Sequence, residues 1–301
     1  MSAQSADPLS LHGVLPPTVT AFDSDESLDT NATAAHARFV VENGCHGVVA
    51  LGTNGEFPLL TPEERRQVVT VVADEIDDVP VIAGVGAPST RQTVAHAQHA
   101  QSVGADGVMV VTPYYYPLDD RGAVEHYRRV TEAVDLPVYV YHIPGRTGNA
   151  LSLSAFDEIA ALDGIAGVKD SSKDVPWLGQ VIDSNPELTV LAGSDSLLFA
   201  GLSVGCQGAI SAVANVFPEL VVDLYEAFAA GDRERARGVQ SAVYQVRSAL
   251  KSGPYMAGVK SALSLRDVDF DAGGLRSPLR TMDDDQRDAL EATLSDLGLL
   301  E

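Results

Sequence analysis

The chain has 301 residues, of which 42 are acidic and 20 are basic, so its formal charge at pH 7 is −22. The length fits one large domain, or one domain with a small appendage, and 45% of hydrophobic residues supply a sizeable core, which excludes a mainly disordered chain. So negative a surface repels phosphate backbones, and we therefore expect no nucleic-acid partner.

Eight short apolar runs alternate along the chain with helical patterns. Most runs are β-branched and uninterrupted, as expected for parallel strands that are buried on both faces of a sheet. In chain order, the predicted strands are Val14–Thr20, Val48–Leu51, Val81–Val85, Val108–Thr112, Val138–His142, Gly167–Lys169, Val190–Ala192 and Ala209–Ser211.

Amphipathic segments fill the gaps between these runs. Thr61, Pro62 and Glu64 form a capping-box pattern that begins one helix, so Glu64 is interpreted as a cap partner rather than a catalytic acid. The other predicted helices are Asn31–Val41, Thr90–Val103, Gly122–Ala133, Ser154–Leu162, Trp177–Ser184 and Asp195–Val204.

Glycine pairs with one spacing precede four of the predicted strands. The first glycine of each pair can end a helix in a left-handed conformation, and the second lets the chain turn tightly into the sheet. Four such joints indicate a repeated β/α unit, and eight units in about 230 residues fit a TIM (β/α)8 barrel. A doubly wound parallel sheet is the alternative. The pairs are Gly44/Gly47, Gly104/Gly107, Gly164/Gly167 and Gly205/Gly208.

The pattern becomes purely helical after the eighth strand. We assign residues 1–230 to the barrel and residues 231–301 to a C-terminal helical extension that packs on the barrel or on a neighbouring subunit. The helices predicted here are Pro218–Ala230, Arg233–Leu250, Tyr255–Leu265 and Asp283–Leu297, the last beginning with three Asp residues that favour a helix start.

The basic residues are almost all arginine. Lysine occurs only at Lys169, Lys173, Lys251 and Lys260. Acid excess with scarce lysine fits a protein that works in high salt, because a Debye length of roughly 3 Å at 1 M salt screens the self-repulsion of its surface. An ordinary acidic cytosolic protein is the alternative. The salt-adapted interpretation predicts that folded structure is lost in low salt.

Three further observations indicate the cellular compartment of the protein. No apolar stretch is long enough to span a membrane, and Met1–Pro8 lacks the basic and apolar regions of a signal peptide. Cys45 and Cys206 provide no disulfide framework. We therefore expect a cytoplasmic protein without membrane contacts.

In a TIM barrel the active site lies at the C-terminal ends of the strands. This rule selects a small set of polar residues, namely Thr53, Asn54, Tyr114–Tyr116, Tyr141, His142, Lys169, Asp170, Ser194 and Asp195.

Lys169 is the most informative of these residues, because it ends an apolar run in a chain with almost no lysine. A lysine in apolar surroundings is costly unless it is paired or neutral, and a neutral amine attacks a ketone to form a Schiff base. Alternatively, Lys169 extends to solvent at the strand mouth or pairs with Asp170. From the residues alone, the two interpretations are equally supported.

Two neighbours fit a lysine nucleophile. Tyr141 ends the preceding strand, and its phenol can shuttle the protons that imine formation requires, although a core tyrosine with a satisfied hydroxyl is the simpler interpretation. The loop from Gly52 to Gly55 offers backbone N–H groups and the side chains of Thr53 and Asn54 to a carboxylate, or is a plain turn.

Two other motifs are discarded. Gly201-x-Ser203-x-Gly205 matches the nucleophile elbow of serine hydrolases, but the strand and helix around it are in the wrong order. His96 and His99 share a helix face without an acidic third ligand, so we interpret them as an exposed face rather than a metal site.

Four motifs at strand ends carry a family resemblance. These are Gly52-Thr53-Asn54-Gly55-Glu56, Thr112-Pro113-Tyr114-Tyr115, Tyr141-His142-Ile143-Pro144-Gly145-Arg146-Thr147-Gly148 and Gly167-Val168-Lys169-Asp170. Together they resemble the dihydrodipicolinate synthase / N-acetylneuraminate lyase superfamily of pyruvate-dependent class I aldolases, from about Leu15 to the C-terminus.

The resemblance implies a mechanism without metal or cofactor. Lys169 condenses with the ketone of pyruvate or of a 2-keto acid, and Tyr141 acts as general acid and base. Thr53 passes protons between Tyr141 and Tyr115, which in this family comes from the adjoining subunit of a tight dimer, and a homotetramer made of two such dimers is implied. The implied substrate contacts are Gly52, Thr53, Asn54, Arg146, Gly193 and Ile210.

The particular reaction is open among members of the superfamily. The motif from Gly52 to Pro58 looks like that of 4-hydroxy-2-oxoglutarate aldolases, whereas Tyr114–Pro117 and Gly193–Asp195 look like archaeal 2-keto-3-deoxygluconate aldolases. Arg146 instead matches the arginine with which dihydrodipicolinate synthases bind the carboxylate of their second substrate.

We favour a sugar-acid aldolase that cleaves 2-keto-3-deoxygluconate or its 6-phosphate to pyruvate and glyceraldehyde or its 3-phosphate. The close alternative is a 4-hydroxy-tetrahydrodipicolinate synthase, which condenses pyruvate with aspartate semialdehyde. Two alternatives of other classes are a non-catalytic ligand-binding barrel and a hydrolase acting through Ser203.

Overall fold

The computed structural model describes residues 9–300, and the predicted absence of a signal peptide at Met1–Pro8 concerns residues outside this range. Eight strands form one sheet in which every neighbouring pair is parallel. They are β1 (Gly13–Leu15), β4 (Val48–Ala50), β5 (Val81–Gly84), β6 (Gly107–Val111), β7 (Val138–His142), β8 (Ile165–Asp170), β9 (Thr189–Ala192) and β10 (Gly208–Ile210).

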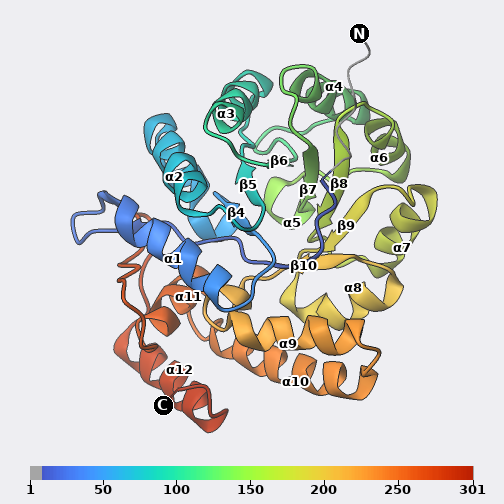
Figure 1. Ribbon diagram of the computed structural model, residues 1–301. Helices are drawn as coiled ribbons and strands as arrows, with labels where there is room; N and C mark the ends of the chain where they lie inside the picture. Colours follow the sequence, from blue (N-terminus) through green and yellow to red (C-terminus); the bar gives the residue numbers. More distant parts are fainter. Residues whose placement is uncertain (1–8, 301) are drawn as a thin grey trace.

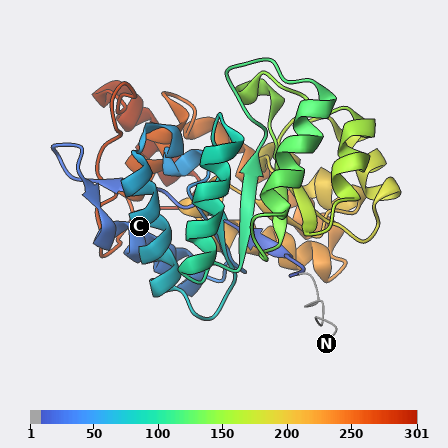
Figure 2. The ribbon, with the colours of Figure 1, turned by 90° about the horizontal axis from the view of Figure 1, so that it is seen from above.

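The sheet closes into a barrel where the strands at its two edges, β1 and β4, meet. Beyond β1, Pro17 forms a parallel bridge with Val49 of β4, and the N–H of Thr18 donates to the Val49 carbonyl at 3.0 Å. The helices encircle the strands in chain order (Figure 1), and Figure 2 shows the same barrel turned by 90°. The predicted TIM barrel is therefore confirmed, and the doubly wound sheet is excluded.

The predicted helices of the barrel are present, with ends shifted by a few residues. They are α1 (Thr30–Glu42), α2 (Pro62–Glu75), α3 (Thr90–Ser102), α4 (Asp120–Thr131), α6 (Leu153–Ala160), α7 (Val175–Ser184), α8 (Leu198–Val204) and α9 (Pro218–Ala229). Thr61 and Glu64 form the predicted capping box of α2.

Some local structure was not predicted. A one-turn helix, α5 (Pro144–Thr147), follows β7, and a small hairpin, β2 (Ala21–Phe22) with β3 (Leu28–Asp29), precedes α1. The first strand also ends at Leu15 instead of Thr20, because Pro16 and Pro17 have no N–H to donate to a strand ladder.

The glycine pairs act partly as predicted. Gly44, Gly104, Gly164 and Gly205 all have positive φ angles, as a left-handed helix end requires. The second glycine has a different role from the predicted tight turn. A Cβ at Gly208 would lie 2.3 Å from the carbonyl oxygen of Gly13 on the neighbouring strand, so this glycine permits close approach of the strands.

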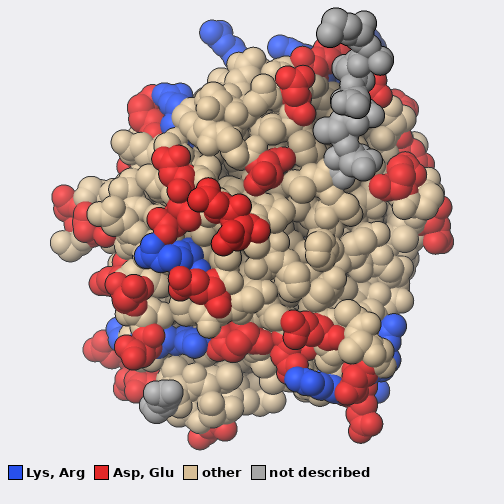
Figure 3. All heavy atoms as spheres, viewed as in Figure 1, with Lys and Arg blue, Asp and Glu red and all other residues tan. Residues whose placement is uncertain are grey.

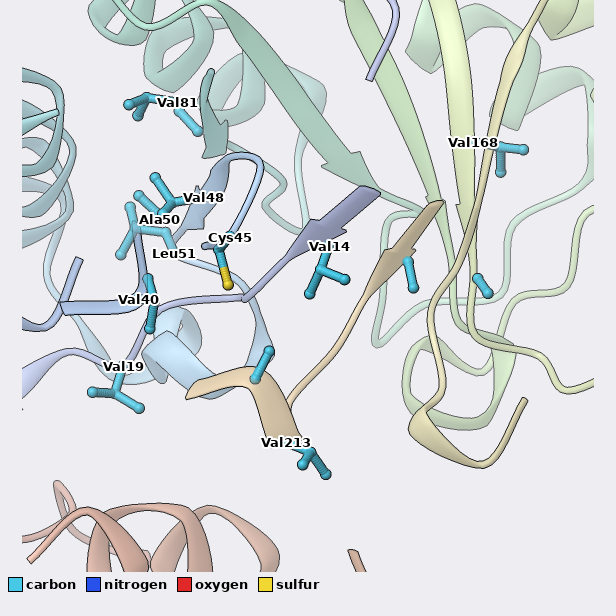
Figure 4. Close-up of a cluster of buried hydrophobic side chains, with 14 of the residues drawn as sticks. Val14, Val19, Val40, Cys45, Val48, Ala50, Leu51, Val81, Val168 and Val213 are labelled. Carbon is cyan, nitrogen blue, oxygen red and sulfur yellow. The ribbon is translucent and has the colours of Figure 1, made fainter. Parts of the chain in front are cut away.

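Alternation along the strands divides the core in two. Val48 faces the helices with Val14, Val40 and Val213 (Figure 4), whereas its neighbour Val49 belongs to a separate cluster inside the barrel. In β8 the same alternation turns Val168 toward the helices and Lys169 toward the barrel interior, where its register partners are Tyr141 and Leu191.

The last three helices lie at one side of the barrel (Figure 1). They are α10 (Arg233–Ala249), α11 (Tyr255–Leu263) and α12 (Asp284–Asp296), and α10 packs against α9 and α12. Asp283 caps α12, and the buried Leu290 and Leu294 form its apolar face. The separate extension over residues 231–301 stays a prediction, with its start in the turn between α9 and α10.

The surface reflects the composition of the chain. On the face shown in Figure 3, acidic side chains greatly outnumber basic ones. None of the helices within residues 9–300 combines the length and the hydropathy needed to cross a membrane.

Candidate active site

A cavity of about 430 Å³ opens at the C-terminal ends of the strands. Seven of the predicted site residues line it, of which six come from five different strand ends and the seventh, Arg146, lies on α5. The six are Thr53, Asn54, Tyr141, Lys169, Gly193 and Ile210. The strand-end rule selected four of these residues (Thr53, Asn54, Tyr141 and Lys169), and the family resemblance added Gly193, Ile210 and Arg146.

Lys169 lies at the base of this cavity and is 3% exposed, so it does not extend to solvent. Its Nζ lies 3.9 Å from the centre of the Tyr141 ring. Within the described part of the chain Lys169 forms no ion pair, because Asp170 lies on the opposite face of β8. Both structural alternatives for Lys169 are therefore excluded.

Asp170 instead belongs to a polar cluster behind the strand. His142 Nδ1 donates to Asp170 Oδ1 at 2.9 Å, while the N–H of Leu151 donates to His142 Nε2 at 3.2 Å. The Ser172 hydroxyl donates to the other oxygen of Asp170. His142 and Asp170, both selected by the strand-end rule, thus face the helices and fix the strand ends that carry Tyr141 and Lys169.

Tyr141 is connected to the loop after β4. Its hydroxyl and Thr53 Oγ1 are 3.1 Å apart. Burial raises the pKa of the Tyr141 phenol, but the positive charge of Lys169 and hydrogen bonds from Thr53, Ser171 and Lys169 outweigh it, so this pKa lies below its ordinary value. A phenol that loses its proton more easily than usual is suited to proton transfer.

The loop that carries Thr53 and Asn54 is held in an unusual conformation. The residues on either side of it, Leu51 and Glu56, have positive φ angles although neither is glycine, and such backbone is often found at functional sites. A Cβ at Gly52 would lie 2.7 Å from Pro17, so only glycine fits beneath the loop. Gly52 therefore supports the loop from below and does not line the main cavity.

The same loop is anchored by the C-terminal region. The buried carboxylate of Glu56 lies 3.0 Å from Lys260 of α11, and it accepts a hydrogen bond from the N–H of Arg276 at 3.1 Å. Burial raises the pKa of Glu56 and lowers that of Lys260. Each charge therefore depends on the other, and the pair fixes the end of the loop.

Asn54 offers an unoccupied donor. It is buried, lines the cavity, and its Nδ2 has no hydrogen-bond partner within the described residues. Buried donors are nearly always paired, so this one indicates an acceptor on a ligand. At Gly193, a Cβ would lie 2.1 Å from Ser171 Oγ and 2.7 Å from the carbonyl oxygen of Asp170, so glycine lets these two neighbouring segments at the cavity approach closely.

The outer part of the cavity holds residues that sequence reasoning missed. Arg146, which was predicted, lies there on α5. The missed residues are Ser171, Lys173, Arg247, Lys251 and Tyr255, the last three from the region beyond residue 230. The scarcity of lysine was a usable signal, because three of the four lysines line this one cavity.

Tyr115 is not brought to the cavity of its own chain. It is 83% exposed, has a positive φ angle, and stacks edge-on against Tyr116 in the prominent loop of residues 112–119 (Figure 2). Its neighbour Tyr114 lies instead in an adjoining apolar cavity of about 320 Å³, which shares Thr53 and Arg146 with the main cavity.

The discarded motifs are not sites. Ser203 lies within α8, and its hydroxyl donates to the carbonyl of Phe199 one turn earlier, as is usual for a serine inside a helix. The nucleophile of a hydrolase elbow lies instead at the turn between a strand and a helix. His96 and His99 are half-buried against α2, so their predicted position on an exposed face was wrong. No group of three or more His, Cys, Asp or Glu residues within residues 9–300 is arranged to hold a metal ion.

The molecule is thus a TIM barrel with a buried lysine, a tyrosine and a threonine at its C-terminal mouth. The model of the dihydrodipicolinate synthetase family matches residues 10–297, and the chain belongs to this family. The relatives named below are lyases and synthases, which places the protein in an enzyme family.

Two relatives show the range of similarity. An uncharacterized DapA-like lyase of Halobacterium salinarum is 73% identical over 297 residues, covering 98% of this chain and 97% of the relative. A 4-hydroxy-tetrahydrodipicolinate synthase of Natronomonas pharaonis is 36% identical over 287 residues, covering 95% of this chain and 97% of the relative.

Solved structures agree with the fold over its whole length. YagE, a prophage protein of the dihydrodipicolinic acid synthase family from Escherichia coli solved in complex with pyruvate, has a TM-score of 0.91 at 32% identity, covering 96% of this chain and 99% of that one. Dihydrodipicolinate synthase from Thermotoga maritima has a TM-score of 0.90 at 32% identity, covering 97% of this chain and 100% of that one.

Proposed function

We propose that the protein is a Schiff-base-forming, pyruvate-dependent aldolase that cleaves 2-keto-3-deoxy sugar acids, either 2-keto-3-deoxygluconate or its 6-phosphate, to pyruvate and glyceraldehyde or its 3-phosphate. The observation that carries this proposal is the unpaired amine of Lys169, buried beside the Tyr141 phenol at the base of a cavity whose outer wall is polar. The similarity to a family member solved in complex with pyruvate supports it.

In this mechanism the Lys169 amine attacks the ketone of the sugar acid, and the carbinolamine loses water to form an imine. Tyr141 supplies the proton for the departing hydroxyl and Thr53 relays protons to it, as their 3.1 Å separation allows. Asn54 donates its free N–H to the substrate carboxylate. The lysine imine needs no metal and no cofactor, because it accepts electrons itself.

The imine then drives bond cleavage. Tyr141 removes the proton from the 4-hydroxyl, the bond between C3 and C4 breaks, and its electron pair moves into the imine to give an enamine and the free aldehyde. Protonation of the enamine and addition of water return pyruvate and the free amine of Lys169. A preorganised acid–base pair of this kind contributes about 10²–10⁴-fold to the rate.

A sugar-acid substrate is favoured by the outer wall of the cavity. Hydroxyl-binding groups line it, including the Tyr255 hydroxyl, which donates to Asp195 Oδ2 at 2.9 Å, and the hydroxyl of Ser171. The 73% identical relative is named an uncharacterized DapA-like lyase, a name that is compatible with either reaction.

The second candidate is 4-hydroxy-tetrahydrodipicolinate synthase. It is favoured by Arg146, which lies at the cavity where the second substrate's carboxylate would bind, and by the 36% identity to enzymes of that name over nearly the whole chain. The Lys169 imine is common to both reactions, so the cavity base does not distinguish them.

A substrate panel tests the proposal. Pyruvate is mixed with glyceraldehyde, with glyceraldehyde 3-phosphate or with aspartate semialdehyde, and product formation is followed in each case. We expect turnover with one or both glyceraldehydes, and turnover with aspartate semialdehyde alone would refute the sugar-acid proposal. Borohydride trapping with pyruvate is the second arm, because the lack of an adduct on Lys169 would favour a non-catalytic ligand-binding barrel.

We also propose a homotetramer composed of two tight dimers. Its support is Tyr115, which is 83% exposed and outside the cavity of its own chain, so a neighbouring subunit is needed for Tyr115 to reach Thr53. Sedimentation equilibrium checks the assembly, and an active monomer would contradict it.

Adaptation to high salt and a cytoplasmic location complete the proposal. The charge of −22, the acidic face in Figure 3 and the similarity to a protein of Halobacterium salinarum support the first, and the two free, buried cysteines fit the second. Circular dichroism during dialysis from about 3 M to 0.1 M salt should show loss of helix, because weaker screening lengthens the Debye length toward roughly 10 Å. Full structure in low salt would refute the adaptation.

A further inference from the structure

The outer half of the cavity concentrates positive charge in a very acidic protein. Besides Lys169, four cations line the cavity: Arg146 on α5, Lys173 after β8, Arg247 on α10 and Lys251 just beyond it. Asp195 is the single carboxylate among the lining residues. The chain as a whole carries about two acids for each base, so the charge balance of this cavity is reversed.

Asp195 does not neutralise the group. It is buried and already accepts hydrogen bonds from the hydroxyls of Ser211 at 2.6 Å and Tyr255 at 2.9 Å, and it lies 3.7 Å from Arg247 Nε. Arg247 is therefore the cation with which Asp195 forms an ion pair. Within residues 9–300, Arg146, Lys173 and Lys251 form no ion pair.

The unpaired cations repel one another. Partial burial lowers the pKa of Lys251, and the charges of Arg247, Lys173 and Arg146 lower it further, while Asp195 opposes them. Lys173 also has a positive φ angle of 70°, which is unusual for a residue with a side chain. Like charges held together in this way form a site for an anion, which removes their repulsion on binding.

We propose that Lys173 and Lys251, with Arg146 beside them, form a subsite for the terminal phosphate of a phosphorylated 2-keto-3-deoxy sugar acid. This inference rests on the proposed aldolase function and specifies its substrate class: the phosphorylated acid, with glyceraldehyde 3-phosphate as the aldehyde product.

The number and origin of the cations favour phosphate over a second carboxylate. A carboxylate is matched by one arginine fork, whereas a phosphate monoester carries close to two charges and three acceptor oxygens. The donors come from three separate segments of the chain that line one cavity. Direct contacts also survive high salt, where longer-range attraction is screened.

The test compares two aldehydes that differ only in the phosphate. Steady-state kinetics are measured at one fixed salt concentration with saturating pyruvate and either glyceraldehyde 3-phosphate or glyceraldehyde. The proteins are the wild type, Lys173→Gln, Lys251→Gln and the double variant. Arg237→Gln is the matched control, because Arg237 is an exposed cation of α10, the helix that precedes Lys251, and does not line the cavity.

We expect the wild type to prefer the phosphorylated aldehyde by about tenfold or more in kcat/KM, because hydrogen bonds to a charged phosphate are stronger than those to a neutral hydroxyl. The double variant should lose at least tenfold more kcat/KM with the phosphorylated aldehyde than with the free one, mostly through KM. Arg237→Gln should keep the wild-type preference. Equal losses with the two aldehydes, or no preference in the wild type, would overturn the subsite.

Binding of inorganic phosphate separates this inference from the proposed function. Calorimetric titration at the same salt concentration should show saturable binding to the wild type that the double variant loses. If neither aldehyde reacts but this pattern appears, the aldolase proposal fails and the anion subsite is supported. If the aldehydes react without a phosphate preference and inorganic phosphate does not bind, the subsite fails and the aldolase proposal stands.

Discussion

The inner and outer halves of the cavity are constructed from different parts of the chain. The inner half (Thr53, Asn54, Tyr141 and Lys169) is buried or nearly so and comes from strand ends or the short turns directly after them. The outer half (Arg146, Lys173, Arg247, Lys251 and Tyr255) is mostly exposed and comes from later loops and from α10 and α11. Both halves meet in one cavity but are held in place by different contacts.

The difference suggests a division of work. Strand register fixes Lys169 opposite Tyr141, so the inner half has little freedom to change without changing the barrel. The side chains of the outer half project from loops and a helix end, where substitutions are tolerated. We therefore attribute imine chemistry to the inner half and the choice of aldehyde to the outer half.

The strongest test of this division is Lys169→Arg. Arginine keeps the positive charge but stays protonated, so it does not form an imine. Activity should fall by at least about a thousandfold, a scale known from the removal of covalent nucleophiles. Mass spectrometry after borohydride treatment with pyruvate should find no adduct on the variant.

A gain-of-lysine variant controls this experiment. Arg237→Lys adds an exposed amine outside the cavity, and it should trap no pyruvate at the new position while Lys169 still does. An adduct on the Lys169→Arg protein would show that another residue is the nucleophile and that the inner half is misassigned.

The second prediction concerns Tyr141→Phe, which removes the proton carrier and keeps the ring that packs near Lys169. We expect kcat to fall by about 10²–10⁴-fold, as for the loss of a general acid–base group. Tyr139→Phe is the matched control, because Tyr139 also faces the barrel interior from β7. Its hydroxyl donates a hydrogen bond to the carbonyl of Leu9 and does not line the cavity. Similar losses in the two variants would point to a packing role for Tyr141.

The two halves also differ in how well the sequence predicted them. The eight strands and the positions of Lys169 and Tyr141 followed from β-branched runs and the strand-end rule, which are local signals. Lys251 and Tyr255 come from the helical region beyond residue 230, where no local signal shows that the turn after α10 reaches the cavity mouth. The scarcity of lysine, which is a signal of composition, marks Lys251 but not Tyr255.

Two residues selected together with the inner half, His142 and Asp170, were misplaced for a simpler reason. His142 was grouped with Tyr141 because both end the same strand, but adjacent strand residues point to opposite faces. With Tyr141 facing inward, His142 had to face outward, where it lies 4.4 Å from the Trp177 ring and bonds to Asp170. Strict application of the two-residue period would have predicted this.

The third prediction uses the contact between Thr53 and Tyr141. Thr53→Val removes a hydrogen bond that lowers the Tyr141 pKa, so this pKa should rise. Since less phenolate is then present at a given pH, the limb of the rate profile on which activity rises with pH should move to higher pH. Thr53→Ser keeps the hydroxyl and should leave the limb in place. A limb that moves equally in both variants would contradict the contact's role.

The smallest expected effect comes from Asn54→Ala, and it tests the division most directly. Loss of the free Nδ2 donor should raise the KM for pyruvate by about tenfold, as for a hydrogen bond to a charged group, and should affect the KM for the aldehyde far less. Lys251→Gln should show the reverse, raising the KM for glyceraldehyde 3-phosphate more than that for pyruvate. This crossed pattern requires two separate binding regions, because a general distortion of the cavity would raise both constants in both variants.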